Sequence, residues 1–430
     1  MDHRTGNPGE FTVRRVVSLL SGLLVVLLVL SSAPGAAAEN WARFRGPGGA
    51  GISHDKGLPV TWTDKDYRWK TALPGLGHSS VCVWDNQLFV TSALDSGRQR
   101  LVFSLDSKSG KILWSDKLAS RTHSKHQLNS FASATPASDG RRVYVLFSTN
   151  EDTVVRAYDF KGQRLWQADV GPFHNKHGHG CGTSPIVWQD TVIVASQHDG
   201  PSSIVGLDAA TGKLRWKSDR QVRLTAHSTP VVLERKNKTP QLFFSNTGDG
   251  IGSIDPRNGN VLWRANLFTT RAVNSPVIAG NLVLAIAGGG GKGKQMAAIP
   301  VDQSGEVAAD KVAWTRERNL PYVPTPLAFG NHLYFWADNG VVTCLESATG
   351  KDVWMQRVGG KYWASPICVD GKIYNITDKG EVVVLASGAK YQLLGRTQLG
   401  EPVHSTPAVS QGRMFLRTFK HLYCLEAGKK

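Results

Sequence analysis

The polar and apolar positions of the chain repeat one pattern: an apolar strand end, a polar turn, and a second strand that opens on tryptophan. In LDAATGKLRW (residues 207–216), leucine closes the first strand, aspartate caps the turn, glycine supplies a positive φ, and tryptophan starts the next strand. The pattern predicts a series of β-hairpins. Related stretches end at Trp114, Trp166, Trp263, Trp314 and Trp354.

A second sequence marker occurs once in each repeat unit. Ser-Pro or Thr-Pro followed by alternating apolar residues occurs seven times, and Val81 fills the same slot in an earlier unit. The two markers together define eight units of roughly 40 to 56 residues, a period typical of four-stranded propeller blades. The marker prolines are Pro136, Pro185, Pro230, Pro276, Pro326, Pro366 and Pro407.

The two ends of the repeat array complement each other. The C-terminal CLEAGKK stops where a tryptophan-bearing strand is due, while YRW at residues 67–69 precedes the first full unit. An N-terminal strand that completes the last blade would close the ring and hide two sheet edges. We therefore predict an all-β, eight-bladed β-propeller of four-stranded antiparallel blades over residues 67–430, closed by an N-terminal strand. Gly395 replaces the expected tryptophan at one junction, which we expect to pack less tightly.

Residues 1–38 have the features of a secretory signal. Two adjacent arginines precede a short apolar run, and three alanines form a small-residue cleavage site. We expect the mature chain to begin near Glu39 and residues 39–66 to form an N-terminal arm. No stable membrane span is expected after cleavage, whereas an uncleaved signal would anchor the protein. The paired arginines leave twin-arginine export open as an alternative route.

The net charge is strongly positive. It is +16 for the full chain and falls to +15 (47 minus 32) once the signal, with its three arginines and two acidic residues, is removed. Such a surface could favour anionic polysaccharide, lipid headgroups or acidic proteins as partners, but solvated charge spread over eight blades is the explanation we prefer. Export and the lack of familiar motifs argue against nucleic acid. We expect a periplasmic or extracellular protein.

The five cysteines do not suggest a disulfide framework. Cys344 and Cys424 occupy the same position in different units, and Cys82 and Cys368 fall on innermost strands of non-adjacent blades. These positions predict buried thiols.

The repeats resemble those of the pyrroloquinoline-quinone (PQQ) propeller superfamily, whose tryptophan-docking motif is A-x-D-x-x-T-G-x-x-x-W. The resemblance extends from about residue 67 to the C-terminus. It implies that the repeat tryptophans pack between blades and donate their indole N–H to the neighbouring blade. These structural residues are Trp69, Trp114, Trp166, Trp216, Trp263, Trp314 and Trp354.

The superfamily contains both quinone-dependent dehydrogenases and non-catalytic envelope proteins, so the resemblance leaves two functions open. Many of the dehydrogenases carry a disulfide between adjacent cysteines and acidic and amide ligands for calcium. The sequence has no Cys-Cys pair, and no positions match the calcium ligands. We favour a monomeric, non-catalytic binding or scaffolding module of the cell envelope with a protein or polysaccharide partner and no cofactor. The alternative is an oxidoreductase using PQQ or a transition metal at one face of the propeller.

Three histidines occupy the same position in their repeats, three residues before the second marker. His78, His227 and His404 therefore lie at the start of innermost strands, near the mouth of the central channel. Blades eight and one are neighbours while blade four lies across the ring. We expect only His78 and His404 to share a ligand.

Two long loops that lead into innermost strands carry further histidines. Residues 120–133 include His123 and His126, and residues 172–182 include HNKHGHGC. Loops of one class on adjacent blades emerge on one face, so these side chains are expected to converge. Imidazole and thiolate together would suit zinc or copper, but the explanation we prefer is a glycine-rich loop whose histidines form hydrogen bonds to the backbone or face water. The candidate metal ligands are His174, His177, His179 and Cys181.

Overall fold

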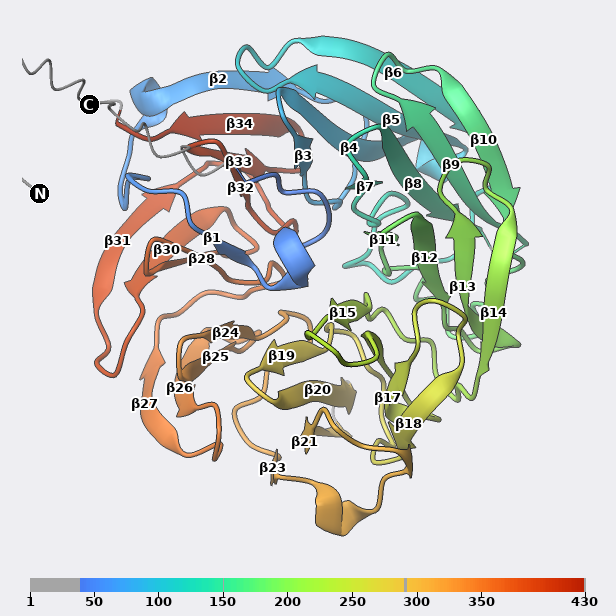
Figure 1. The fold of residues 1–430 in the computed structure, drawn as a ribbon. Coiled ribbons are helices and arrows are strands. Elements are labelled where there is room, and N and C mark those ends of the chain that lie inside the picture. Colours follow the sequence, from blue (N-terminus) through green and yellow to red (C-terminus); the bar gives the residue numbers. More distant parts are fainter. Residues whose placement is uncertain (1–38, 150, 290–291, 429–430) are drawn as a thin grey trace, which may run out of the picture. The chain divides into compact units, whose positions relative to one another are not determined.

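The computed structural model describes residues 39–149, 151–289 and 292–428. Their sheets stand around a central axis, each with its first strand innermost (Figure 1). The predicted all-β, eight-bladed propeller of four-stranded antiparallel blades is confirmed. The predicted signal at residues 1–38 lies outside the described residues.

Each of the first four blades uses consecutive strands. Blade 1 comprises β3 (Cys82–Trp84), β4 (Gln87–Leu94), β5 (Gln99–Asp106) and β6 (Ile112–Ala119); blade 2, β7 (Ala137–Ser138), β8 (Arg142–Ser148), β9 (Thr153–Asp159) and β10 (Arg164–Asp169); blade 3, β11 (Ile186–Trp188), β12 (Thr191–Ser196), β13 (Ser202–Asp208) and β14 (Leu214–Arg220); blade 4, β15 (Val231–Leu233), β16 (Gln241–Asn246), β17 (Gly250–Ile254) and β18 (Val261–Ala265).

The other four blades follow the same plan, with the last completed from the N-terminus. Blade 5 comprises β19 (Val277–Ala279), β20 (Leu282–Gly289), β21 (Lys292–Pro300) and β23 (Trp314–Arg316); blade 6, β24 (Leu327–Phe329), β25 (His332–Trp336), β26 (Val341–Glu346) and β27 (Asp352–Arg357); blade 7, β28 (Ile367–Val369), β29 (Lys372–Ile376), β30 (Glu381–Ala386) and β31 (Leu393–Gln398); blade 8, β32 (Ala408–Ser410), β33 (Arg413–Arg417), β34 (His421–Glu426) and β2 (Tyr67–Ala72).

Two short strands extend blades in parallel. β22 (Gly305–Glu306) lies beside β18, and β1 (Ile52–Ser53) lies beside β28. The helical elements are single 3-10 turns: η1 (Pro47–Gly49), η2 (Asp64–Asp66), η3 (Asp95–Gly97) and η4 (Ala309–Lys311). None of the helices within the described part of the chain is long and apolar enough to cross a membrane.

The burial of each strand reflects its place in the blade. Middle strands such as β4 and β5 are buried along almost their whole length, whereas the outer strand β6 alternates between half-buried and exposed positions. This alternation matches a strand with one face against the neighbouring blade and the other in solvent.

The N-terminal strand closes the ring as predicted. β2 pairs antiparallel with β34, with Trp69 opposite Cys424 and Ala72 opposite His421. Pairing chain ends in one blade removes two open sheet edges, which stabilises the ring.

The hydroxyls of the second sequence marker form a closed hydrogen-bonded ring around the channel. In every blade the marker residue donates its backbone N–H to the hydroxyl oxygen of the marker residue in the next blade, at 2.9 to 3.2 Å. The ring ties all blades together at their innermost strands. Its members are Ser80, Thr135, Ser184, Thr229, Ser275, Thr325, Ser365 and Thr406.

Most of the predicted docking tryptophans bridge adjacent blades. The indole N–H groups of Trp69, Trp114, Trp166 and Trp354 donate to carbonyls of the following blade at 3.0 to 3.1 Å. The motif glycine of that blade lies against the indole: a Cβ at Gly110 would come within 2.5 Å of Trp69.

Three tryptophans depart from the expected bond. Trp263 donates to Gln241 of its own blade at 3.2 Å. The Nε1 atoms of Trp216 and Trp314 are buried without a partner among the described residues. Gly259 and Gly350 of the following blades still lie against these two indoles, so their packing role is kept.

The junction at Gly395 is sealed by the N-terminal arm. A Cβ at Gly395 would come within 2.2 Å of the Val60 carbonyl oxygen and 2.6 Å of the Thr61 side chain. Trp62 is buried, and its backbone N–H donates to Thr397 at 3.2 Å. The prediction that this junction packs less tightly is therefore wrong, because the arm occupies the space that a tryptophan fills elsewhere.

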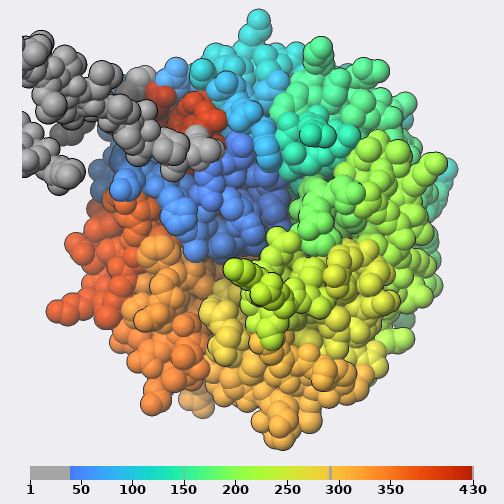
Figure 2. All heavy atoms as spheres, in the orientation of Figure 1, coloured from blue at the N-terminus to red at the C-terminus, as the bar shows by residue number. Residues whose placement is uncertain are grey.

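The first part of the arm enters the channel from the end where the innermost strands finish. Figures 1 and 2 show this blue segment in the middle of the ring. Asn40 accepts a hydrogen bond from the N–H of Asp85, in the turn after β3, while Arg43 and Arg45 donate to the carbonyls of Pro230 and Thr325 at 2.8 and 2.7 Å. The arm thus connects blades far apart in the sequence.

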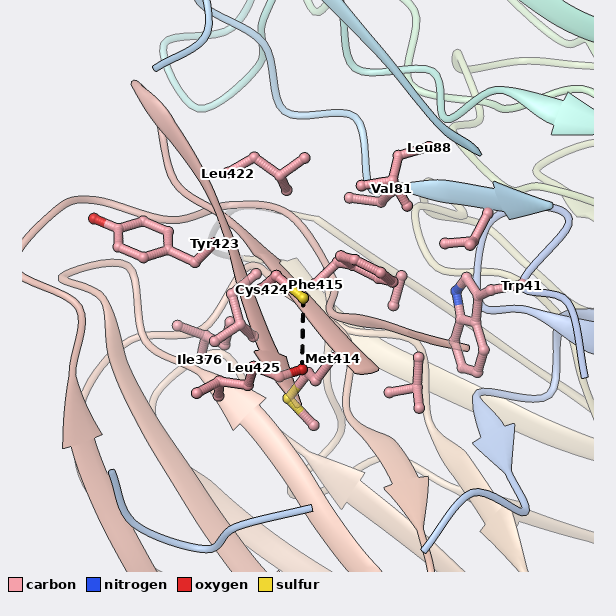
Figure 3. Packing of buried hydrophobic residues seen from close by; sticks show 14 of the residues in the cluster. Trp41, Val81, Leu88, Ile376, Met414, Phe415, Leu422, Tyr423, Cys424 and Leu425 are labelled. Carbon is pink, nitrogen blue, oxygen red and sulfur yellow. Dashed lines mark hydrogen bonds between the residues drawn. The ribbon is translucent and has the colours of Figure 1, made fainter. Parts of the chain in front are cut away.

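Trp41 anchors the arm in a hydrophobic cluster. Its side chain is 1% exposed and lies near Val81, Leu88 and Phe415, from the first and last blades (Figure 3). We call the arm-filled end of the channel the arm face and the opposite end the loop face.

The cysteines form no disulfide. Cys82, Cys344, Cys368 and Cys424 are buried and Cys181 is half-buried, which confirms the expectation of thiols.

Candidate functional site

The predicted histidines gather on the loop face. Two loops dominate it: the blade 2 loop (residues 120–133) and the blade 3 loop (residues 172–182). Each leads from an outermost strand to the innermost strand of the next blade.

Amide side chains lock these two loops together. Asn129 of the blade 2 loop donates to the carbonyls of His179 and Cys181 at 2.8 and 3.1 Å. Asn175 of the blade 3 loop donates to the carbonyl of Ser124 at 2.7 Å. The expected convergence of the loops is present, and the reciprocal bonds fix their relative position.

His78 and His404 lie side by side, as their places on neighbouring blades predict. Their ring centroids are 4.4 Å apart, and both rings contact Phe419 at 4.8 and 4.9 Å. His404 Nδ1 lies 3.2 Å from the Leu128 carbonyl, so the blade 2 loop reaches blade 8. Burial, followed by the nearby His404, holds the pKa of His78 well below its usual value.

A second histidine cluster centres on His179. Its ring is parallel to that of His126 at 5.6 Å, and the ring of His177 is 6.3 Å away. The Nη1 atom of Arg271, which comes from the approach to blade 5, lies 3.1 Å from His179 Nε2. Burial and then the Arg271 charge lower the pKa of His179 to about 4.

His227 belongs with this second cluster. Its ring packs against Gly182, where a Cβ would come within 2.9 Å of Nδ1. Burial lowers its pKa to about 3, and the next largest contributions come from Arg271 and His179.

A third group lies at the outer side of the blade 3 loop. The rings of His174 and His198 are 5.4 Å apart, and burial, then His174, lowers the pKa of His198 to about 4. A hollow of about 490 Å³ opens here, lined partly by His174, Lys176 and Asp199.

The four candidate metal ligands are divided among these surroundings. His177 and His179 are neighbours, His174 faces His198, and Cys181 packs against the core of blades 2 and 3. Burial raises the pKa of the Cys181 thiol, which disfavours the thiolate that a metal requires. No group of three or more His, Cys, Asp and Glu side chains suited to a metal occurs in the part of the chain that the structure describes. The metal hypothesis stays a prediction.

Sequence reasoning missed Arg271, His198 and Asp199. His198 and Asp199 come from the loop between the second and third strands of blade 3, while Arg271 precedes blade 5. The repeat register could have identified His198 and Asp199, because a loop between the second and third strands of a blade emerges on the same face as the loops that carry the predicted histidines.

Comparison with known proteins places the fold in a family. The PQQ_2 profile, described as outer membrane protein assembly factor BamB, matches residues 52–177, 102–356 and 306–390, more than half of the chain. The chain belongs to this family. PQQ_2 repeats are the units recognised above from their tryptophan and Ser/Thr-Pro markers.

The individual relatives are distant in sequence. Outer membrane protein assembly factor BamB of Yersinia pestis is 22% identical over 302 residues, which is 63% of this chain and 71% of that protein. Tetrathionate hydrolase of Acidithiobacillus ferrooxidans is also 22% identical, over 64% of this chain and 53% of that protein. The chain therefore aligns with about half the length of the hydrolase.

Solved structures share the fold. BamB from Moraxella catarrhalis matches with a TM-score of 0.61 and 15% identity over 83% of this chain and 98% of that chain. A europium-containing methanol dehydrogenase matches with a TM-score of 0.68 and 11% identity, over 90% and 98%. An assembly factor and a dehydrogenase thus share one architecture, so the fold alone does not decide the function.

Proposed function

We propose that the protein is an exported, non-catalytic module of the cell envelope that uses its loop face to bind an envelope protein or polysaccharide. One observation carries the proposal: the arm fills one end of the channel, while interlocked loops form an exposed surface at the other. The description of the family as an outer membrane protein assembly factor supports the envelope setting, together with the predicted signal.

The loop face has the properties of a recognition surface. His126, Lys176 and His177 are exposed and come from two loops that the amide bonds hold in place. Loops supported by a rigid scaffold place binding groups without a large ordering cost on association.

A capture experiment with matched faces tests the proposal. The chain beginning at Glu39 is immobilised and incubated with envelope extract, beside two double variants. Lys176→Ala with His177→Ala alters the loop face, and Lys161→Ala with Lys213→Ala removes exposed lysines from the arm face. We expect the loop-face variant to lose a stoichiometric partner that the arm-face variant retains. Equal capture by both variants would contradict the proposal.

The alternative, an oxidoreductase using PQQ or a metal, makes a different prediction. After incubation with PQQ and Ca²⁺, such an enzyme would show bound quinone absorbance and oxidise alcohols or sugars. Either result with the chain beginning at Glu39 would replace the binding-module proposal.

A further inference from the structure

The blade 2 loop reaches across blade 1 to blade 8 through the histidines at the channel mouth. The backbone N–H of His78 donates to the Ala132 carbonyl at 3.0 Å and to Ser130 Oγ at 3.1 Å. On the blade 8 side, His404 Nδ1 lies 3.2 Å from the Leu128 carbonyl. A carbonyl can only accept hydrogen bonds, so Nδ1 carries a proton and donates it to the loop. The loop therefore contacts both members of the histidine pair.

The two imidazoles occupy a half-buried site that suits uncharged rings. Their centroids are 4.4 Å apart, and both rings pack against Phe419. His78 Nε2 is buried and has no hydrogen-bond partner among the described residues. A charged imidazole carries a proton on each nitrogen, so His78 in its charged form would bury an N–H without an acceptor. That arrangement is costly in the protein interior.

Positive charges surround the pair. Arg417 is 2% exposed, donates to the main-chain carbonyls of blade 1 and forms no ion pair with any described residue. Arg417 and Lys125 of the blade 2 loop both disfavour a proton on His78. The neighbouring carboxylate that favours a proton on His404 is Asp378, in the turn after β29. Burial has the largest effect, and it lowers the pKa of both imidazoles below its ordinary value.

We propose that His78 and His404 form a pH-sensitive latch that holds the blade 2 loop closed while both rings are neutral and releases it when acid charges them. In an open arrangement both rings reach solvent and have ordinary pKa values. Protons therefore bind to the open arrangement first, and they favour it below about pH 6.5. The closed latch is fully stable above that pH and loses stability as the pH falls.

The latch regulates the surface to which the proposed function assigns recognition, and to that extent the inference rests on the proposed function. The blade 2 loop carries the exposed ring of His126, and Asn129 joins it to the blade 3 loop. Release of one loop therefore disturbs both. Binding of a partner to the closed surface would weaken in acid.

Hydrogen–deuterium exchange tests the latch without a partner. Exchange of the peptide spanning residues 120–133 is measured on the chain beginning at Glu39 at pH 7.5 and pH 5.0, and is corrected for the intrinsic effect of pH on amide exchange. We expect the corrected rate in this loop to rise by about tenfold or more in acid, because each protonated histidine adds to the opening. Exchange in β8, a buried strand of the same blade, should stay slow.

A double variant and a matched control assign the effect to the pair. His78→Gln with His404→Gln removes both titrating rings and keeps side chains that can donate to the loop, so the rise in acid should disappear. His332→Gln changes a half-buried histidine at the arm face and should keep the rise. Histidine NMR of the parent chain is a second measurement that needs no variant. The rings of His78 and His404 should gain their protons over the same pH range in which the loop opens.

The possible results separate the latch from the proposed function. Equal corrected exchange at both pH values in the parent chain, or a rise that persists in the double variant, would overturn the latch. So would protonation of both rings without opening of the loop. Capture of an envelope partner by a chain whose loop ignores pH would contradict the latch alone, whereas a pH-dependent loop on a chain that captures no partner would contradict the proposed function alone.

Discussion

The two ends of the channel differ in the surroundings of their arginine side chains. At the arm face, Arg43 and Arg45 are buried and donate to main-chain carbonyls, and burial lowers the pKa of both to about 9. At the loop face, Arg271 lies beside the imidazole of His179, and its Nε donates to the Thr225 carbonyl at 2.8 Å. One end of the ring is closed by the N-terminal arm, whereas the other carries interlocked loops with exposed polar side chains. Under the proposed function, one scaffold separates stability at the arm face from recognition at the loop face.

The largest expected loss of stability follows from a substitution at the arm face. Trp41→Ala removes a fully buried indole from the cluster that joins the first and last blades. We expect the free energy of unfolding to fall by about 3 to 5 kcal/mol in urea denaturation. His126→Ala at the loop end is the matched control and stays within about 0.5 kcal/mol of the parent. Equal losses in both variants would refute the contrast between the two ends.

The loop end makes the stability depend on pH. The folded-state pKa of His227 is lowered to about 3, so the unfolded chain binds a proton that the folded chain does not as pH falls from 6.5. Stability is therefore full above pH 6.5 and is lost below it, with a slope of about 1.4 kcal/mol per pH unit for one such histidine. His227→Gln should flatten the profile measured by urea unfolding between pH 6.5 and 4. An unchanged slope would show that His227 does not remain neutral in the folded chain.

A smaller loss of stability is expected at the blade junction that the arm covers. Gly395→Ala places a Cβ against the Val60 carbonyl, which we expect to destabilise the protein by about 1 to 3 kcal/mol. Limited proteolysis should then release the arm sooner than in the parent chain. Gly293→Ala is the control, because nothing lies within 4 Å of its added Cβ. Unaltered release in Gly395→Ala would mean that the arm does not seal this junction.

The smallest expected effect concerns the hydroxyl ring between the two ends. Thr229→Val removes the acceptor of the Ser184 N–H and leaves a buried donor unpaired. We expect a loss of about 1 to 2 kcal/mol in chemical unfolding, and Thr229→Ser should recover most of it. If valine is tolerated as well as serine, the ring of hydrogen bonds contributes little.

The repeat register was sufficient to predict the architecture. The spacing of the tryptophan and Ser/Thr-Pro markers predicted eight blades. The last unit lacks its tryptophan-bearing strand, so the strand at Tyr67 was assigned to that blade. The places of His78 and His404 on neighbouring blades predicted that the two rings lie together. These features follow from local turn chemistry and period, which a single sequence contains.

Contacts between non-repeating segments could not be predicted in the same way. The arm has no periodic pattern, so neither the burial of Arg43 nor the position of Val60 at Gly395 could be derived. The partner of His179 was missed because Arg271 lies 92 residues away. The role of the marker hydroxyls emerged only from the geometry that links each blade to the next.

Photo-crosslinking from the two faces tests the central claim most directly. A photoreactive residue replaces His126 on the loop face or Lys213 on the arm face, and the chain beginning at Glu39 is irradiated with envelope extract. We expect a specific crosslinked product from position 126 and none from position 213. A product from position 213 alone would contradict it.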